Sequence, residues 1–373
     1  MQIEPFKIER YFAQYEFNAQ YLLSPSDCES LSMQELLQMA SPESLALWQG
    51  LRLGYTESQG HPWLRSAVAE LYQHISPENV IIAAPEEAIF IAMQTLLQPG
   101  DQVIAISPAY QSLHEIARSI GCELINWKLQ PVMDGTWHLD FGQLEASLTA
   151  HTRLLVINFP HNPTGHTITH GTLEALIRLA RKHDLYLFSD EMYRLLEYQP
   201  STQLPPVCDL YEKGISLSGL SKSFALPGLR IGWLAAQESA LIERWLAFKD
   251  YTTICSSAPS EILGLVALQN KDWIVHRNLE IIRANLESAE RFFGEHESYF
   301  FWYSPKAGSV TFPEWLGPGS VEQFCQGLLE KQGVMIVPGS LFDFPGNHFR
   351  VGLGRKNLPE ALEHVARYLL GSQ

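Results

Sequence analysis

The sequence predicts an α/β protein, with a large domain built on a mostly parallel sheet flanked by helices and a smaller α+β domain. Two observations predict this fold. Short apolar runs alternate with amphipathic stretches between residues 79 and 235, which is typical of parallel strands joined by helices. Beyond residue 256 the pattern becomes mainly helical, and short β-rich runs follow near the end. The length of 373 residues suits one large and one small domain.

The elements of the large domain, which we assign to residues 46–255, follow in order. Residues 79–83 form a β-rich run. A helix is expected next over 87–97, and Pro99-Gly100 ends it. Helices are also expected over 110–120 and 172–183, the latter with its apolar residues on one face. The remaining strands are expected at 102–107, 123–129, 152–158, 185–189, 214–218 and 229–235.

The two ends of the chain are predicted to form the rest of the molecule. Residues 1–45 are aromatic and look irregular, and we expect them to contribute to the small domain and to cover the active site. The small domain should occupy residues 256–373, with a long helix over 273–293. Its strands are expected at 309–312, 334–337 and 348–352.

Composition excludes several classes of partner. The chain holds 26 Lys and Arg against 41 Asp and Glu, a net charge of −15, which disfavours nucleic acid and anionic membranes. Five cysteines without a CxxC pair indicate reduced thiols. No apolar stretch reaches the ~20 residues of a membrane span, and we expect a cytoplasmic protein. His166 and His170 have HxxxH spacing, but a loop precedes them, so no metal is expected.

Chemically active side chains follow the apolar runs. In an open α/β sheet, ligands bind beyond the carboxyl ends of the strands, so these side chains should meet in one crevice. They are the acids Glu86, Glu87 and Asp190, the phenols Tyr110 and Tyr193, the amide Asn162, the hydroxyl Ser221 and the amine Lys222. A lysine, an acid and an anion site together suit a Schiff-base lysine with pyridoxal phosphate, whose pyridine nitrogen a carboxylate keeps protonated.

Several motifs resemble a known family. NFPHNPTG at 158–165, SDEMY at 189–193, SGLSKSFALPGLRIGW at 218–233 and FRVGLG at 349–354 together resemble fold-type I aminotransferases of class I and II, the aspartate aminotransferase superfamily. The resemblance runs from about Tyr55 onwards and is closest to the capreomycidine-synthase-like members. It implies a pyridoxal-phosphate enzyme whose large domain binds the cofactor.

The resemblance also implies roles for single residues. Lys222 would form the internal aldimine and carry the proton between the substrate α-carbon and the cofactor. Asp190 would pair with the pyridinium nitrogen, Asn162 and Tyr193 would hydrogen-bond the phenolic oxygen, and Tyr110 would stack on the ring.

The phosphate and the substrate carboxylate have their own residues in this family. Ser221 and Arg230 would hold the phosphate, and Tyr55 would reach the phosphate of the neighbouring subunit, which implies a homodimer with shared active sites. Arg350 would form a forked pair with the substrate α-carboxylate, and Asn162 would also contact the substrate.

The phosphate loop departs from the family pattern. It reads Ala84-Pro85-Glu86-Glu87, where a loop rich in Gly, Ser and Thr is usual, and Gly219 stands where a serine commonly lies three residues before the lysine. Pro85 has no N–H to donate, and Glu86 would repel a phosphate dianion unless it points away. We therefore expect either a lower affinity for the cofactor or a phosphate cup rebuilt around the helix over 87–97, with Glu86 and Glu87 at the cofactor.

The predicted function is transfer of the amino group of an α-amino acid to a 2-oxo acid. The same residues would serve elimination, β/γ-replacement or cyclisation of an amino acid, as in the capreomycidine-synthase-like members. A cofactor-sensing regulator and a non-catalytic scaffold are weaker alternatives. Substrate selectivity should rest on residues 15–30, His161, Tyr193 and the turn at 307–309.

Overall fold

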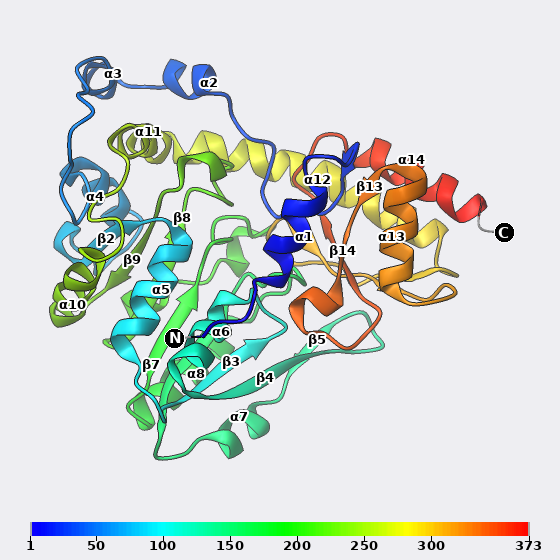
Figure 1. Ribbon diagram of the computed structural model, residues 1–373, viewed down its shortest axis with the longest axis horizontal. Coiled ribbons are helices and arrows are strands. Elements are labelled where there is room, and N and C mark those ends of the chain that lie inside the picture. The colour runs from blue at the N-terminus through cyan, green and yellow to red at the C-terminus, as the bar shows by residue number, and fades with distance from the viewer. Residues whose placement is uncertain (1, 372–373) are drawn as a thin grey trace.

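The protein is built around an eight-stranded sheet in the order β2-β9-β8-β7-β6-β3-β4-β5. The computed structural model describes residues 2–371. Strands β8, β7, β6, β3 and β4 run parallel, whereas β9 and β5 are antiparallel to their neighbours (Figure 1). The bounds are β2 Val80–Ala83, β9 Gly232–Ala236, β8 Gly214–Gly219, β7 Tyr186–Asp190, β6 Thr152–Asn158, β3 Gln102–Ser107, β4 Glu123–Pro131 and β5 Trp137–Leu139. The predicted mostly parallel α/β fold is confirmed.

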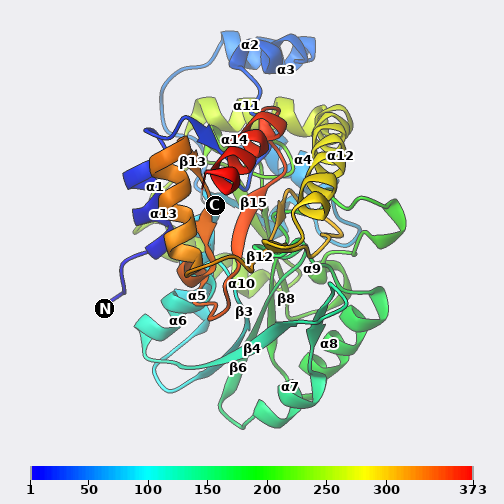
Figure 2. The same cartoon turned by 90° about the vertical axis from the view of Figure 1, so that its right-hand side faces the viewer.

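Helices cover both sides of this sheet. Helices α5 (Pro85–Leu96) and α6 (Ser112–Ile120) lie on one side, and α8 (His170–Lys182) lies on the other (Figure 2). The apolar face of α8 is buried, as its periodicity predicts. Because both sides are covered, the central strands are apolar along most of their length. Further helices are α4 Pro62–Ala69, α7 Phe141–Ser147, α9 Val207–Leu210 and α10 Ser239–Lys249.

The strand ends that carry the site lie side by side in the sheet. Asn158, the last residue of β6, is in register with Asp190, the last residue of β7, and Asp190 is in register with Leu217 of β8. Parallel register therefore brings the segments that follow these strands to one edge of the sheet.

The C-terminal part holds a second, aromatic core. In it Phe324 of α13 stacks on Trp315 of β12 with ring centroids 4.1 Å apart. A three-stranded sheet of β11, β15 and β14 lies beside this core, and β15 carries Arg350. The bounds are α11 Ala258–Gln269, α12 Lys271–Glu295, β10 Phe300–Phe301, β11 Val310–Thr311, β12 Glu314–Trp315, α13 Val321–Gln332, β13 Val334–Met335, β14 Val337–Pro338, β15 Phe349–Gly352 and α14 Leu358–Leu370.

The N-terminal segment contradicts the expectation that residues 1–45 are irregular. It forms α1 (Lys7–Tyr15), β1 (Tyr21–Leu22) and α2 (Met33–Gln38), and α3 (Pro42–Gln49) begins within it. Ile8, Tyr11, Phe12 and Tyr15 of α1 recur at helical spacing, a period that our interpretation of the sequence missed, and α2 begins with a Ser32 capping box. Strand β1 pairs in parallel with β13 of the C-terminal part, whereas α3 packs against α11.

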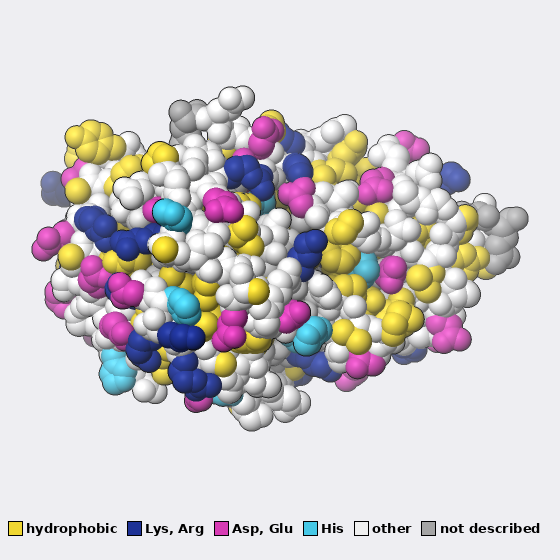
Figure 3. Space-filling model, turned by 90° about the horizontal axis from the view of Figure 1, so that it is seen from below, with side chains coloured by type: hydrophobic (Ala, Val, Ile, Leu, Met, Phe, Trp, Pro, Cys, Tyr) yellow, Lys and Arg dark blue, Asp and Glu magenta, His cyan; other side chains and the backbone are white. Residues whose placement is uncertain are grey.

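The surface carries charges of both signs. Basic and acidic side chains are interspersed over the face seen in Figure 3. Within residues 2–371 no helix is long and apolar enough to span a membrane, and no group of three or more His, Cys, Asp or Glu side chains could hold a metal ion. All five cysteines are free, and four of them are buried.

Candidate active site

A cavity of about 530 Å³ lies at the carboxyl edge of the sheet, between the N-terminal segment and β15. Of the residues predicted for the site, nine line it: Glu86, Tyr110, Asn162, Asp190, Tyr193, Ser221, Lys222, Arg230 and Arg350. They come from segments more than 260 residues apart in sequence, so the fold assembles one site from many strand ends.

Lys222 lies in the turn that follows β8. Its Nζ donates a hydrogen bond to Ser26 Oγ over 2.8 Å. Burial lowers the pKa of the Lys222 ammonium, opposed by the Asp27 carboxylate, and the nearby Arg350 guanidinium lowers it further. A lysine in such surroundings loses its proton more readily than a solvated one, which is what a nucleophilic amine needs.

Asp190 ends the buried strand β7. Its carboxylate accepts a hydrogen bond from the backbone N–H of Met192 over 3.0 Å. Burial raises the pKa of the Asp190 carboxyl to about 6, although the Met192 N–H and the Lys222 charge oppose this shift. A buried carboxyl of this kind gains from a cationic partner, because such a partner offsets the cost of burying its charge.

A neighbouring amide ties the strand ends together. Asn158 Nδ2 donates to the Asp190 backbone carbonyl over 2.9 Å, and Asn158 Oδ1 accepts from the backbone N–H of Asn162 over 2.9 Å. Asn158 opens the NFPHNPTG motif, but the motif alone assigns no role to this residue. It holds Asn162 at the cavity.

The two tyrosines differ in their hydroxyl contacts. Tyr110 donates to Glu9 Oε1 over 2.6 Å, and its ring lies 4.8 Å from that of Phe6. Tyr193 Oη is buried near Ser26, but no partner among residues 2–371 meets hydrogen-bond geometry. Burial raises the pKa of both phenols, so both are neutral at pH 7. An unsatisfied buried hydroxyl on a cavity wall indicates a place for a polar ligand atom.

Arg350 crosses from β15 into the cavity and is 1% exposed. Its Nε and Nη2 donate to the Ser24 carbonyl over 3.2 and 2.9 Å, and Nη1 donates to Asn162 Oδ1 over 3.2 Å. The guanidinium has no carboxylate partner within residues 2–371. Burial lowers its pKa, and the cation remains available for an anionic ligand.

The end of the cavity near α5 explains the departure of Gly219 from the family pattern. A Cβ on Gly219 would lie 2.9 Å from Gly232 Cα and 3.2 Å from Pro85 Cγ. A Cβ on Gly232 would lie 2.8 Å from Pro85 Cγ. The backbone of Gly232 and Ile231, together with the proline ring, therefore fills the space that a serine side chain would need. Arg230 and Ser221 line this end, and the Arg230 side chain is exposed.

Some residues that the sequence singled out lie outside this cavity. Tyr55 is 90% exposed, and Glu87 Oε1 accepts hydrogen bonds from the hydroxyls of Thr252 and Thr253. His161 is buried and bonds Thr164, and neither it nor the turn at 307–309 lines the cavity.

The N-terminal segment supplies cavity residues that the sequence did not identify individually. Glu9 and Phe12 of α1 and Glu16, the C-cap residue of this helix, lie three and four positions apart and share one face, and Ser26 and Asp27 follow from the loop after β1. This spacing of Glu9, Phe12 and Glu16 is the signal in the sequence that could have identified them. Only Glu16, Ser26 and Asp27 fall within the stretch 15–30 that we expected to govern selectivity.

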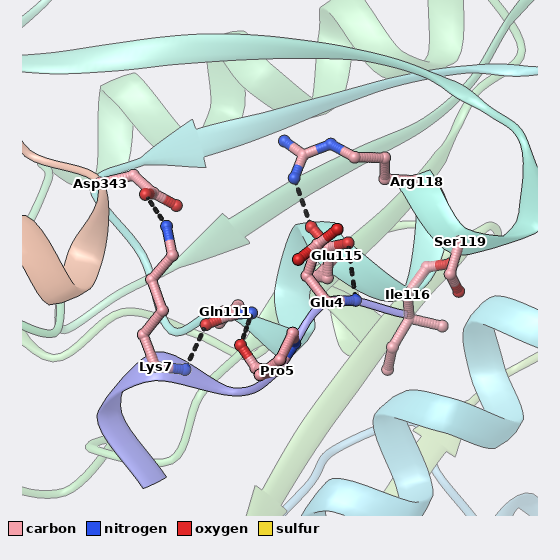
Figure 4. Close-up of polar contacts among 9 residues, drawn as sticks. All are labelled: Glu4, Pro5, Lys7, Gln111, Glu115, Ile116, Arg118, Ser119 and Asp343. Atoms are coloured by element: carbon pink, nitrogen blue, oxygen red, sulfur yellow. Dashed lines mark hydrogen bonds and ion pairs between the residues drawn. The ribbon is translucent and has the colours of Figure 1, made fainter. Parts of the chain in front are cut away.

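Polar contacts anchor the start of this segment over α6 (Figure 4). The Lys7 backbone N–H donates to Gln111 Oε1 over 2.9 Å, and Gln111 Nε2 donates back to the Pro5 carbonyl over 3.0 Å. The Lys7 side chain pairs with Asp343 from the C-terminal part. The segment thus bridges the two sides of the cavity.

These residues fit pyridoxal phosphate. Lys222 offers an amine, Asp190 offers a buried carboxyl for a ring nitrogen, and the unpartnered Tyr193 hydroxyl offers a donor for a ring oxygen. Arg230 and Ser221 offer a cation and a hydroxyl for the phosphate, although Glu86 stands beside them.

Comparisons with known proteins agree with this chemistry. The sequence model of the family described as aminotransferase class I and II matches residues 21–368. Capreomycidine synthase of Streptomyces vinaceus is 29% identical over 84% of this chain and 80% of its own length. Aspartate aminotransferase of Musicola paradisiaca is 30% identical over 77% of this chain and 74% of its own length.

Solved structures are similar over the full length. A PLP-dependent aminotransferase from Streptococcus suis superposes with a TM-score of 0.93 at 30% identity and covers 100% of this chain and 99% of its own. The PLP-dependent cyclase OrfR superposes with a TM-score of 0.91 at 26% identity over 100% of this chain and 99% of its own.

Proposed function

The chain belongs to the class I and II aminotransferases, and from this premise we propose that it moves the amino group of an α-amino acid to a 2-oxo acid. Its cofactor is pyridoxal phosphate, as in the similar enzymes. The observation that carries the proposal is the placement of Lys222, Asp190 and Arg350 on one cavity. That cavity offers an amine, a buried acid and a carboxylate-binding cation together.

Each residue has a distinct task in this reaction. Bound pyridoxal phosphate supplies an electron sink for the bonds of the substrate α-carbon. Lys222, whose pKa burial lowers, would take the proton from the substrate α-carbon and deliver it to the cofactor carbon that keeps the amino nitrogen. Asp190 would hold a proton on the pyridine nitrogen, and the neutral Tyr193 hydroxyl and Asn162 would orient the ring. Arg350 binds the α-carboxylate and, together with the N-terminal segment, limits the access of water.

The substrate side chain in this proposal carries a positive charge. Three carboxylates of the N-terminal segment, those of Glu9, Glu16 and Asp27, line the cavity. Tyr110 donates to Glu9, and Arg355 pairs with Asp27 over 2.9 Å. Glu16 has no side-chain hydrogen bond or ion pair within residues 2–371. Burial, then Asp27 and Glu9, raise its pKa, and the Arg355 and Lys222 charges oppose this shift. A cationic side chain would relieve this repulsion, whereas an anionic one would add to it.

Geometry supports the direction in which that side chain extends. The Arg350 guanidinium lies 5.8 Å from the centre of the Phe12 ring, on the same face of α1 as Glu16. An amino acid whose carboxylate pairs with Arg350 therefore lies beside the α1 acids.

The test compares arginine with citrulline, its neutral analogue of similar shape, and with glutamate. The loss of the visible band of the holoenzyme would be followed for each amino acid. A charge-assisted contact is worth about 1.5–3 kcal/mol, so arginine should exceed citrulline by about tenfold or more in kcat/KM, and Glu16→Gln should shrink this ratio. Glu243→Gln, an exposed acid on α10, is the matched control. Equal kcat/KM values for arginine and citrulline would contradict the proposal that the substrate side chain is charged, but not the proposal that the enzyme is an aminotransferase.

A second candidate function is cyclisation or replacement on an amino acid. Relatives named capreomycidine synthase and PLP-dependent cyclase favour it. Mass spectrometry of the product distinguishes the two. A 2-oxo acid formed in step with amination of an acceptor supports transamination, whereas a product that keeps its amino nitrogen supports the second candidate.

The proposed assembly is a homodimer with shared sites. Leu53, Tyr55 and Tyr251 are 87%, 90% and 90% exposed, and the loops that carry them are joined by a Lys249 Nζ to Ser58 carbonyl contact over 2.6 Å. Exposed apolar side chains on two loops that contact each other suit a second copy of the chain. In that dimer Tyr55 reaches the partner's cavity.

Mixing inactive variants tests the shared site. Tyr55→Ala and Lys222→Ala subunits would each be inactive alone, but a mixed dimer holds one intact site. Random exchange should then restore about a quarter of wild-type activity. No recovery despite subunit exchange, measured with tagged chains, would exclude the shared site.

The proposed location is the cytoplasm. All five cysteines are free, which suits a compartment that keeps thiols reduced.

A further inference from the structure

Glu86 occupies an unusual position, on the wall between two cavities. It is the second residue of α5 and lines both the active-site cavity and a neighbouring, mainly apolar cavity of about 380 Å³. It therefore stands at the end of the active site where α5 begins.

Of the two acids in the first turn of α5, Glu86 is the one that faces the active site. Pro85 has its ring packed against Gly219 and Gly232, and it offers no N–H. Glu87 turns away to Thr252 and Thr253. The anion-binding capacity of this helix start therefore depends on its other first-turn amides and on the charge state of Glu86.

Charged groups from several elements face Glu86. Burial raises the pKa of its carboxyl to about 7, opposed by the Ser112 hydroxyl of α6. Glu9 of α1 and Asp190 of β7 raise it further, and Arg230 lowers it. Tyr110 also lies near and is neutral. At pH 7 the carboxyl is therefore poised between its neutral and charged forms.

The cofactor phosphate belongs at this same end. Arg350 lies at the other end, where Ser24 and Asn162 hold it. The only acceptor bonded to Arg230 within residues 2–371 is the Pro227 carbonyl, over 3.1 Å, so its charge is free for an anion. Arg230 and the α5 amides together suit a phosphate. An ionised Glu86 would oppose that dianion, whereas a neutral carboxylic acid could donate to it.

We propose that Glu86 binds the cofactor phosphate as a neutral carboxylic acid, donating its proton to a phosphate oxygen, so that cofactor binding is linked to protonation of this residue. The unprotonated apo-protein must take up one proton at Glu86 to bind. Cofactor affinity therefore falls as the pH rises above the pKa of Glu86, by up to tenfold for each pH unit.

The test measures the dissociation constant of pyridoxal phosphate for the apo-protein between pH 6 and 8.5. Wild type and Glu86→Gln should differ little at pH 6. At pH 8.5 the variant should bind about 30-fold more tightly than wild type, because the amide stays neutral 1.5 pH units above the wild-type pKa of about 7. Glu87→Gln, whose side chain faces Thr252 and Thr253, should keep the wild-type slope. Lys222 and the phosphate titrate in all three proteins alike. Their effects therefore cancel when the dissociation constant of a variant is divided by that of wild type at the same pH.

The inference would be overturned if the dissociation constant of pyridoxal phosphate depended on pH in the same way in wild type and Glu86→Gln. It would also be overturned if Glu87→Gln changed this pH dependence as much as Glu86→Gln does. A second measurement needs no variant. Calorimetry at pH 8 in buffers of different ionisation enthalpy should show about one more proton taken up with pyridoxal phosphate than with pyridoxal. Equal proton uptake with both ligands would also overturn it. Because only cofactor affinity is measured, neither result depends on the amino-acid substrate.

Discussion

Replacing Arg350 with lysine tests how the carboxylate site is built. A guanidinium has five N–H donors, and Arg350 gives three of them to Ser24 and Asn162. Five minus three leaves two donors for a ligand, which is the number that a forked carboxylate pair uses. A lysine keeps the charge but cannot hold both protein acceptors and a forked pair at once.

The size of the effect follows from these contacts. Loss of one charge-assisted hydrogen bond to the substrate costs about 2 kcal/mol, which corresponds to a rise of about 30-fold in KM for the amino acid. In the folded protein, a buried acceptor left unpaired at Ser24 or Asn162 costs about 1–3 kcal/mol of stability.

Steady-state kinetics with a saturating 2-oxo acid would give KM, and urea unfolding would give the stability. The dissociation constant of pyridoxal phosphate should stay within about twofold of wild type, because Arg350 lies away from the phosphate end. An unchanged KM in Arg350→Lys would refute the forked pair. A loss of cofactor affinity as large as the rise in KM would show instead that Arg350 supports the whole site.

Other substitutions probe the amine, a buried acid and the packing at α5. Lys222→Ala should abolish turnover and borohydride-reducible attachment of the cofactor, yet keep the far-ultraviolet circular dichroism; turnover that persists would remove the lysine from the mechanism. Burial raises the pKa of Glu197 to about 7, so the folded state binds more protons than the unfolded state between about pH 4.5 and 7, and stability falls as the pH rises through that window. Glu197→Gln should remove a loss on the order of 3 kcal/mol between pH 5 and 8, seen as a flatter pH profile of the urea midpoint. Gly219→Ser places a Cβ against Gly232 and Pro85 and should cost about 1–3 kcal/mol, whereas a thermal midpoint equal to wild type would mean that the proline ring yields easily.

The elements that the sequence predicts best are those buried on both sides. The strands at 102–107 and 152–158 appear with the predicted bounds, since a continuous apolar run is only compatible with the middle of a covered sheet. The strand predicted from 229 begins instead at Gly232, because Pro227–Leu229 form a 3₁₀ turn and Arg230 adopts a left-handed backbone conformation with φ of 55°.

The cavity residues of the N-terminal segment lie beyond such reasoning. Ile8, Tyr11, Phe12 and Tyr15 have the spacing of a helix, but no motif marks Glu9, Phe12 and Glu16 as residues of the cavity. The contact of Ser26 with Lys222 joins residues 196 positions apart, and the contact of Ser24 with Arg350 joins residues 326 apart. Motifs indicate which strand ends meet, but only the folded chain shows which loop closes over them.

The bridge formed by the first thirty residues has a practical consequence for handling the protein. Lys7 and Pro5 bond Gln111 at the start of α6, the strand β1 pairs with β13, and Ser26 contacts the reactive lysine. Helix α14, by contrast, ends at the periphery of the molecule (Figure 1). A purification tag or a surface tether is therefore best fused after α14. A bulky fusion ahead of Lys7 would disturb the N-terminal segment, whose Ser26 positions the catalytic amine.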